Sequence, residues 1–241
     1  KIGAFKVGYM ADALWGTDFG DGSSDGPQIV YLIKTGPFLW VAALEKISEG
    51  RRGGGSATPL LDPGYVDSDS DKYCLFGYYF WQGGESGLMW RRVNIHGNRP
   101  SGVNTYFDTW RAYFKTTIGN LYAEGEFEWL EGKAAEFEDA LDNVLDDVDW
   151  DTYQWYLMAR YTMGPWYIGA QYAHTSGDDP DTTDEIEGFP LVCNVWQPTL
   201  ILWNDWIQRY AGNVGNSNFA AVTTNRFANA DLYQIFAGWK P

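Results

Sequence analysis

The sequence is poor in the residues on which several large classes of function depend. Its 241 residues include 2 His and 2 Cys, and 17 Lys and Arg stand against 32 Asp and Glu, for a formal net charge of −15. Such an acidic chain is not suited to binding nucleic acid through phosphates, which requires basic patches. Two histidines exclude a histidine-rich metal site, and Cys74 and Cys193 have neither metal-ligand nor CxxC spacing. A P-loop, an HExxH motif and a CxxCH haem site are absent from the sequence as well.

Long hydrophobic runs are also missing. The longest, such as residues 38–44, fall far short of the ~18 residues expected of a membrane helix. The mean hydropathy of −0.35 is negative. This value does not exclude a membrane protein, because only alternate residues of a β-barrel strand meet lipid. Lys1 leads directly into strand-like residues with no signal peptide, so we expect a processed mature chain or part of one.

Aromatic residues and glycine are abundant, with 13 Trp, 16 Tyr, 13 Phe and 28 Gly. The clearest pattern runs from Tyr153 to Thr175, where apolar and more polar residues alternate on both sides of Gly164-Pro165. Period-2 alternation puts each set on one face of a strand. The Gly-Pro pair indicates a tight turn that sets Met163 opposite Trp166. Each arm has about the ~9–11 residues of a tilted transmembrane strand.

The connections between expected strands alternate between long and short along the chain. The ten expected strands cover residues 2–12, 28–34, 38–46, 72–82, 88–96, 104–116, 120–131, 153–163, 166–175 and 226–238. Strict alternation of long loops and tight turns is typical of up-and-down outer-membrane barrels. A soluble sandwich, which turns its apolar face inward, has Greek-key crossings and no reason to keep this alternation. The sequence therefore predicts an all-β fold, a transmembrane antiparallel up-and-down β-barrel forming one domain over 1–241.

Three long loops and the two chain ends complete this interpretation. The long loops are 48–70, 132–151 and 176–225, all expected at the extracellular end. Apolar residues at near-helical spacing predict a short helix in 132–151, and the apolar middle of 176–225 suits a loop helix or a plug. Because Lys240-Pro241 resembles a turn leading onward, we expect the ten strands to be part of a larger barrel.

Polar residues on the face opposite the apolar band are candidates for the lining of a pore. Glu124, Glu126 and Glu128 alternate with apolar residues, and Arg111 and Lys115 on the preceding strand face the same way. With a two-residue turn at 118–119, Arg111 is expected opposite Glu126. Three carboxylates beside two cations predict weak cation selectivity. The full expected pore-lining set is Glu124, Glu126, Glu128, Arg111, Lys115, Arg160, Gln154, Gln171, Lys6, Lys34 and Glu45.

Three segments give the chain a resemblance to a known group of proteins. They are GNLYAEGEFEWLEGK (119–133), YLMARYTMGPWYIGAQYAHTSGDD (156–179) and WGTDF (15–19). With these segments, which cover about a quarter of the chain, it resembles the porins of the alginate-export-like and related proteobacterial outer-membrane families. The resemblance implies an outer-membrane channel with long extracellular loops, in many cases with more than ten strands.

His174 and Ser176 suggest a different chemistry. A His-x-Ser pair at the outer end of a barrel strand resembles the catalytic pair of outer-membrane phospholipase A. In that family an Asn follows a dozen residues after the Ser, where this chain has Gly188, with Asn194 as the nearest substitute. Such a Ser needs a His to activate it and a third polar group to orient the imidazole. A rim histidine beside a loop is the simpler interpretation.

The loops suggest two further features. Cys74 and Cys193 both belong to the extracellular end, where the oxidising environment permits a disulfide, and we expect them to form one. The acidic clusters at 67–71 and 178–185 have oxygen ligands for Ca²⁺, although neither has the spacing of an EF-hand loop. Otherwise no cofactor is expected.

The sequence thus favours a non-enzymatic porin of the bacterial outer membrane, surrounded by its lipids. It would form a water-filled channel for passive diffusion of small hydrophilic solutes or ions. A barrel that serves as a scaffold or a sleeve for a partner protein, such as an electron-transfer protein, is the main alternative, and a lipid hydrolase is a further one. Whether the protein forms a homo-oligomer stays open.

Overall fold

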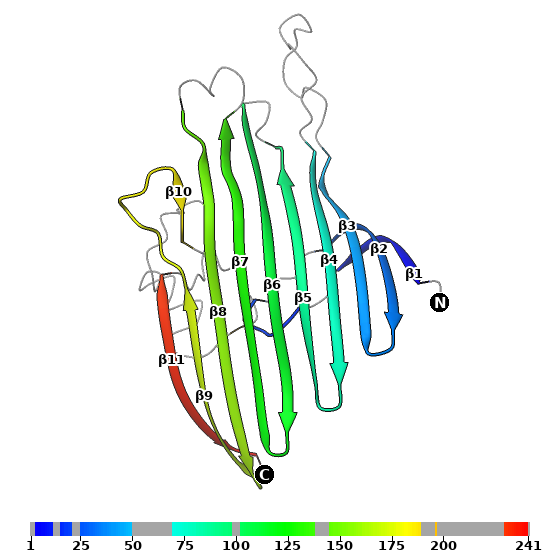
Figure 1. The fold of residues 1–241 in the computed structure, drawn as a ribbon, viewed down its shortest axis with the longest axis vertical. Coiled ribbons are helices and arrows are strands. Elements are labelled where there is room, and N and C mark those ends of the chain that lie inside the picture. Colours follow the sequence, from blue (N-terminus) through cyan, green and yellow to red (C-terminus); the bar gives the residue numbers. More distant parts are fainter. Residues whose placement is uncertain are drawn as a thin grey trace, which may run out of the picture.

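The computed structural model describes residues 3–11, 15–20, 25–49, 69–97, 102–137, 145–188, 196 and 229–240. In this part of the chain the protein is all-β, and the strands form one sheet (Figure 1). The strands are β1 (Ala4–Ala11), β2 (Asp25–Thr35), β3 (Phe38–Ser48), β4 (Ser70–Trp81), β5 (Gly84–Ile95), β6 (Val103–Ile118), β7 (Leu121–Phe137), β8 (Val148–Met163), β9 (Trp166–Thr175), β10 (Glu185–Ile186) and β11 (Ala230–Trp239). The described residues contain no helix long and apolar enough to cross a membrane.

Each long strand pairs antiparallel with the strand that follows it, in the order β1-β2-β3-β4-β5-β6-β7-β8-β9-β11. The two-residue strand β10 lies off this path and pairs parallel with β8. The ten long strands match the ten expected ones in number and order. The prediction of an antiparallel up-and-down sheet is therefore confirmed, and β1 and β11 are its two edges.

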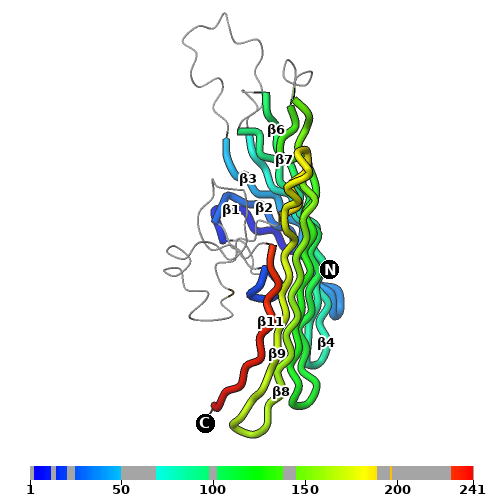
Figure 2. The backbone as a smooth tube through the Cα atoms, turned by 90° about the vertical axis from the view of Figure 1, so that its left-hand side faces the viewer, coloured from blue at the N-terminus to red at the C-terminus, as the bar shows by residue number. Residues whose placement is uncertain are grey.

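No pairing joins β1 to β11 among the described residues, so this sheet is open. Seen from the side, both edge strands bend away from the middle strands toward the side on which segment 15–20 lies (Figure 2). We call the face of the sheet on this side the inner face, and the opposite one the outer face. A closed barrel stays a prediction.

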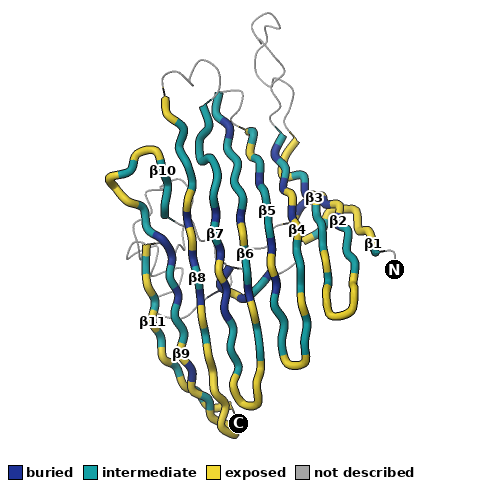
Figure 3. Tube along the Cα trace, in the orientation of Figure 1, coloured by how far each residue is buried: buried dark blue, intermediate teal, exposed yellow. Residues whose placement is uncertain are grey.

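Side-chain alternation divides the sheet into these two faces. On β8, Thr152, Gln154 and Tyr156 are buried, whereas Tyr153 and Leu157 are exposed. Directly paired residues of antiparallel strands point to the same side, so the alternation continues from strand to strand. Buried positions gather in the middle of the sheet, and exposed ones mark the turns and edge strands (Figure 3). The apolar set expected on one face of 153–175 does lie on one face.

Two-residue turns join the strands at one end of the sheet. In three of them the first turn residue is a glycine at positive φ: Gly36 (59°), Gly119 (59°) and Gly164 (57°). Glycine at the first central position suits a type II′ turn, whose twist matches that of the flanking strands. Met163 pairs with Trp166 across the turn at Gly164, as expected from the sequence.

Two expectations were wrong. The turn between β6 and β7 is Gly119-Asn120 and not 118–119, because Gly119 supplies the positive φ that this position requires. Arg111 therefore lies opposite Glu128 instead of Glu126. The helix expected in 132–151 is also wrong for 132–137 and 148–151, which belong to β7 and β8, while 138–144 lie outside the described residues.

At 132–137 and 148–151, pairing with a neighbouring strand, and not the spacing of apolar residues, decided the conformation. Lys133 pairs with both Tyr106 and Asp149. The sheet therefore continues beyond residue 131, where the alternation of apolar and polar residues becomes unclear. Similarly, most of 83–87 belongs to β5 and not to a turn. The expected plug or helix within 176–225 falls mostly outside the described residues.

Gly132 allows this upper part of β7 to form. Its φ is 148°, and a Cβ at this position would lie 2.6 Å from Cα of Phe107, besides meeting the carbonyl oxygen of Tyr106. We expect Gly132→Ala to destabilise the fold by about 1–3 kcal/mol, the usual cost of forced backbone strain. Urea unfolding of the refolded protein, monitored by circular dichroism, measures this loss.

Gly97 provides the matched control, because a Cβ there would meet nothing within 4 Å. Gly97→Ala should leave the unfolding midpoint close to that of the wild type. An equal effect of the two substitutions would contradict the strain assigned to Gly132.

Candidate functional site

The outer face carries a row of aromatic residues across four strands. Trp90, Trp110, Trp129 and Tyr153 pair in sequence from β5 to β8. From this row down to the tight turns, the outward positions of β2 to β8 include no Asp, Glu, Lys or Arg. The same holds on β9 and β11 below the pair His174 and Asp231.

A row of carboxylates lies directly above the tryptophans. The indole N–H of Trp90 donates to Asp108 (2.9 Å), that of Trp110 to Glu131 (3.2 Å), and that of Trp129 to Asp151 (2.7 Å). In each case the acceptor is on the next strand, one outward position farther from the tight turns. Each tryptophan thus has its ring next to the uncharged band and its polar N–H directed to a charged row. Tryptophan takes this orientation at the boundary between an apolar and an aqueous phase.

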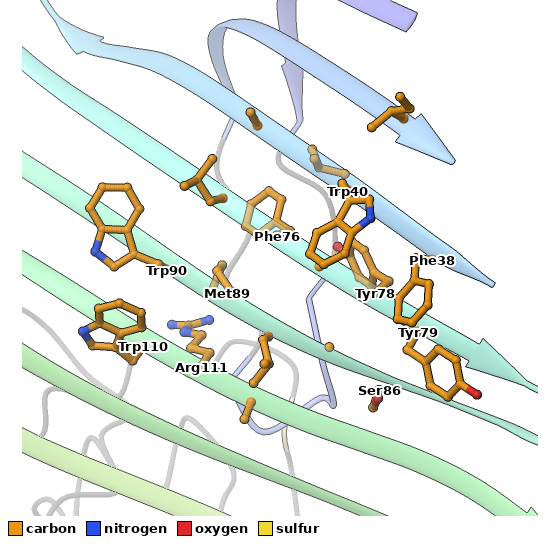
Figure 4. A pocket seen from close by; sticks show the side chains of 18 of the residues that line it. Phe38, Trp40, Phe76, Tyr78, Tyr79, Ser86, Met89, Trp90, Trp110 and Arg111 are labelled. Atoms are coloured by element: carbon orange, nitrogen blue, oxygen red, sulfur yellow. The ribbon is translucent and has the colours of Figure 1, made fainter. Parts of the chain in front are cut away.

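A shallow hollow lies on the outer face within the uncharged band (Figure 4). Its volume is about 640 Å³. Trp90 and Trp110 lie at one end, Phe38, Trp40 and Tyr79 lie along another side, and Ser86 belongs to the lining between them. Small residues such as Gly77 and Ala112 account for its depth.

The inner face has the opposite character, because charged and amide side chains are concentrated there. The strand register puts the entire expected pore-lining set on this face: Lys6, Lys34, Glu45, Arg111, Lys115, Glu124, Glu126, Glu128, Gln154, Arg160 and Gln171. Whether the inner face lines a pore remains a prediction. The paired columns of charge are present in their corrected register, Arg111 with Glu128, Tyr113 with Glu126 and Lys115 with Glu124.

Segment 15–20 covers part of this face. The backbone N–H of Thr17 and its hydroxyl both donate to one oxygen of Glu126, at 2.7 and 2.8 Å. Arg111 in turn donates to the carbonyl of Gly20 at 2.8 Å. Gly16 and Gly20 allow this approach, because a Cβ on either would collide with the Glu126 carboxylate. The segment is therefore bonded to the sheet at two points.

Two aromatic residues of the segment anchor it by packing. Trp15 lies among Phe76, Tyr78 and Tyr113, with ring centroids 5.0–5.5 Å away. Phe19 is fully buried and stacks on Tyr156, 5.2 Å between centroids, with Trp196 packed edge-on against it. Burying rings of this size is a large apolar contribution. The WGTDF segment, singled out above for its resemblance, is thus a structural part of the inner face.

Glu128 is the centre of the buried charges beneath the segment. It is 1% exposed, accepts a hydrogen bond from Arg111 Nε at 2.6 Å and another from Gln154 Nε2 at 2.7 Å. Arg91 lies 3.9 Å from the same carboxylate. Two guanidinium groups and one amide therefore surround this single side chain, which stabilises its charge in an environment with little water.

Nearer the tight turns the inner face is more open and its polar groups are differently arranged. Tyr122 and Tyr156 both donate to Glu124, at 2.6 and 3.0 Å, and Tyr156 also lies 3.3 Å from Gln171. Gln171 donates to Gln234 of β11. Hydroxyl, amide and carboxylate groups that lie this close together can form hydrogen bonds with hydrated solutes.

Sequence reasoning missed several inner-face residues. Lys72 is buried and forms an ion pair with Glu45 at 2.5 Å, and Glu85 accepts from Tyr113 at 3.1 Å. Arg91 also faces inward. Strands 72–82 and 88–96 appeared mixed on both faces, so alternation alone gave no signal. The only signal available was that strand 38–46, which carries Glu45, pairs with strand 72–82, which carries Lys72.

The histidine and serine considered for catalysis are not joined to each other. His174 Nδ1 lies 2.9 Å from Asp231 on β11, and its ring stacks against Tyr153. The Ser176 hydroxyl donates instead to the carbonyl of Glu187 at 2.6 Å and accepts from the N–H of Tyr153. Among the described residues, Asp231 is a polar neighbour of the imidazole. Asn194 lies outside the described residues.

The acidic loop after β9 is held together by its own carboxylates. Asp179 accepts from the N–H of Asp181, and Asp178 accepts from that of Glu187. Burial, followed by the charge of Glu187, raises the pKa of the Glu185 carboxyl above its ordinary value. Within the described ranges, no group of three or more His, Cys, Asp or Glu is arranged to hold a metal ion. The Ca²⁺ expectation has no geometric support there.

Cys74 is buried on the inner face. Cys193 lies outside the described residues, and the disulfide stays a prediction. Comparisons with protein-family models, with curated proteins and with solved structures find no match to this chain. The resemblance to outer-membrane porin families likewise remains an expectation.

The buried charges give a prediction on stability. Glu128→Ala would leave Arg111 and Gln154 without their shared acceptor in a buried position. We expect a loss of about 3–5 kcal/mol in the free energy of unfolding, the usual result of removing one partner of a buried pair. The measurement is urea unfolding of the refolded protein, monitored by circular dichroism.

Glu131→Ala is the control, because this carboxylate lies on the same strand but takes part in an exposed contact with Trp110. Its loss should cost less than about 1 kcal/mol, as for other exposed polar contacts. Equal costs for the two substitutions would refute the role given to Glu128.

Proposed function

We propose that this chain forms the wall of an outer-membrane β-barrel that lets small hydrophilic solutes diffuse passively. The observation that carries the proposal is the separation of charge between the two faces of the same strands. The inner face of the described strands holds twelve charged side chains: Lys6, Lys34, Glu45, Lys72, Glu85, Arg91, Arg111, Lys115, Glu124, Glu126, Glu128 and Arg160. The outer face between the tryptophan row and the tight turns has none on β2 to β8.

A bilayer provides the physical reason for this separation. An Arg or Lys facing lipid at the midplane costs about 2–4 kcal/mol, and polar residues face the lumen of such barrels. Trp40, Leu75, Leu88 and Leu157 are about half exposed or more on the outer face, with relative exposures of 50, 54, 69 and 48%. In a soluble sandwich these side chains would instead be buried between two sheets. Lipid around the outer face explains their exposure.

The dimensions agree with this proposal. From Leu121 to Trp129 the outward residues of β7 are uncharged over nine positions. At about 3.4 Å per residue this gives a length close to the apolar band of ~25 Å in transmembrane barrels. The upper tryptophan row and aromatic residues near the turns, such as Trp166 and Trp239, then mark two interfaces.

Segment 15–20 would narrow the channel. Because it is fixed against Glu126 and Arg111, solutes would pass beside it and along the open part of the inner face, near Glu124 and Gln171.

The weak cation selectivity expected from the sequence has less support than the channel itself. Glu126 and Glu128 are 4% and 1% exposed, which leaves Glu124 as the accessible carboxylate of the three. Among the twelve inner-face charges, seven are cations. We therefore propose a channel for hydrophilic solutes without a strong preference for cations.

Two other functions fit the geometry less well. A scaffold or sleeve would use the inner face to hold a protein, but segment 15–20 and Trp196 already cover part of it. A lipid hydrolase would need Ser176 near the imidazole of His174, whereas its hydroxyl is bonded to Glu187.

Conductance of the refolded protein in planar lipid bilayers tests the proposal. We expect stepwise conductance, and we expect Glu124→Gln to shift the reversal potential in a salt gradient toward anion preference. The double substitution Glu126→Gln/Glu128→Gln should shift it less, because segment 15–20 separates these carboxylates from the solution.

A refolded protein that inserts into bilayers without conducting would contradict the channel. A larger shift from the double substitution than from Glu124→Gln would contradict the accessibility assigned to the three carboxylates.

A further inference from the structure

The hollow on the outer face has the size of a binding site (Figure 4). Its volume of about 640 Å³ lies within the roughly 300–1,000 Å³ typical of ligand pockets. It extends over β2 to β7, since its lining includes Tyr31 on the first of these strands and Phe127 on the last. The passage of solutes along the inner face does not involve this hollow.

Small residues form the floor of the hollow, and large rings form its walls. The floor consists of Ala42, Gly77, Ser86 and Ala112, outward residues of β3 to β6. Aromatic side chains surround them: Phe38, Trp40, Tyr79, Trp90, Trp110 and Phe127. A void beside these rings would lose van der Waals contacts, and a flexible hydrocarbon chain that follows the uneven floor restores them.

The outward part of the lining carries no charge. Among the described residues that line the hollow, no outward one is an Asp, Glu, Lys or Arg. Arg111 also borders it, but its guanidinium group is bonded to Glu128 and to the carbonyl of Gly20 on the inner face. Because burying an unpaired charge is costly, the part of a ligand that lies in the hollow must be apolar.

A pair of opposite charges lies at the end of the hollow that Trp90 and Trp110 form. Arg92 and Asp108 are the next outward residues beyond these tryptophans, and they are directly paired across β5 and β6. Their side chains form an ion pair of 2.9 Å, and the side chain of Arg92 is 37% exposed. Asp108 also accepts the indole N–H of Trp90. One cation and one anion are thus held side by side where the apolar lining ends.

We propose that the hollow and this ion pair together bind one zwitterionic phospholipid. An acyl chain lies in the hollow against the aromatic rings, and the headgroup lies at Arg92 and Asp108. The phosphate is the partner of Arg92, because guanidinium groups bind phosphate oxygens through strong charge-assisted hydrogen bonds. The ammonium group of the same headgroup lies beside Asp108. The ligand is therefore complementary to the site both in its apolar part and in its two charges.

The inference deepens the proposed function, on which it rests for the lipid around the outer face. It goes further because it gives one lipid a fixed position. The remaining lipids contact a surface without such a hollow and exchange freely, whereas this one is retained.

Native mass spectrometry of the refolded full chain, released from detergent micelles that contain phosphatidylethanolamine, tests the proposal. We expect one retained lipid, bound at least about tenfold more tightly than diacylglycerol with the same acyl chains, in line with the strength of hydrogen bonds between charged groups. Phosphatidylglycerol, which lacks the ammonium group, should also bind more weakly. Arg92→Gln should remove the preference for phosphatidylethanolamine over diacylglycerol.

Two pairs of variants separate the site from the rest of the outer face. Ala112→Phe fills the hollow from its floor and should weaken binding of all three lipids. Ala159→Phe is its matched control, because Ala159 faces outward from β8 within the uncharged band but is not among the residues that line the hollow. Lys133→Gln is the control for Arg92→Gln, since it removes a cation of β7 that pairs with Asp149. Both controls should retain phosphatidylethanolamine as the wild type does.

Circular dichroism and heat-dependent gel mobility show that each variant is folded before binding is compared. Equal affinity for the three lipids would overturn the proposal, as would an equal loss in Ala112→Phe and Ala159→Phe. Folded wild-type protein without a retained lipid would overturn it as well. Conductance distinguishes the two claims: a chain that conducts without retaining the lipid contradicts the inference alone. A chain that retains the lipid without conducting contradicts the channel and leaves the lipid site in place.

Discussion

The structure depends on one constraint: every strand must present an uncharged face to one environment and a charged face to another. Because side chains alternate along a strand, this requirement applies to each second residue and fixes the register between neighbours. A slip of β6 by one residue would turn Arg111 to the outer face and Trp110 to the inner face. The same constraint leaves the outer face of β2 to β8 without charges between the tryptophan row and the tight turns, whereas the inner face of the described strands carries charged and amide side chains. Burial, charge and the candidate sites all follow from this division.

On the inner face, two carboxylates of β7, Glu126 and Glu128, hold segment 15–20 against the sheet. Glu126 binds segment 15–20 through Thr17, and Glu128 holds Arg111, which binds the same segment at Gly20. Trp15 and Phe19 of this segment pack against aromatic residues of the sheet. Glu126, Glu128 and Arg111 are thereby part of a buried framework on the inner face. The remaining inner-face charges, such as Glu124 and Arg160, are the ones that solutes reach in the proposed channel.

The fold was largely predictable from the sequence, and the site only in part. Alternation in 120–131 and 153–175 identified strands and faces correctly, since it reports directly on the two environments. It failed in 132–151, where pairing with β6 extended β7 despite a helical spacing of apolar residues. It also could not reveal that Glu126 and Glu128 are covered, because Thr17 lies 109 residues from Glu126 in sequence. Lys72 and Arg91 were missed since neither strand 72–82, which is largely apolar on both faces, nor strand 88–96, which is mixed, shows a clear alternation.

The central claim is that lipid surrounds the outer face and water meets the inner one. Single nitroxide labels at consecutive positions of β8 test it most directly, with the protein reconstituted in lipid vesicles. Labels at 155, 157, 159 and 161 should be relaxed mainly by oxygen, which concentrates in the bilayer. Labels at 158 and 160 should instead respond to a water-soluble nickel chelate, which gives a period of two along the strand. Water-soluble quencher reaching the odd-numbered positions as readily as the even ones would contradict the account.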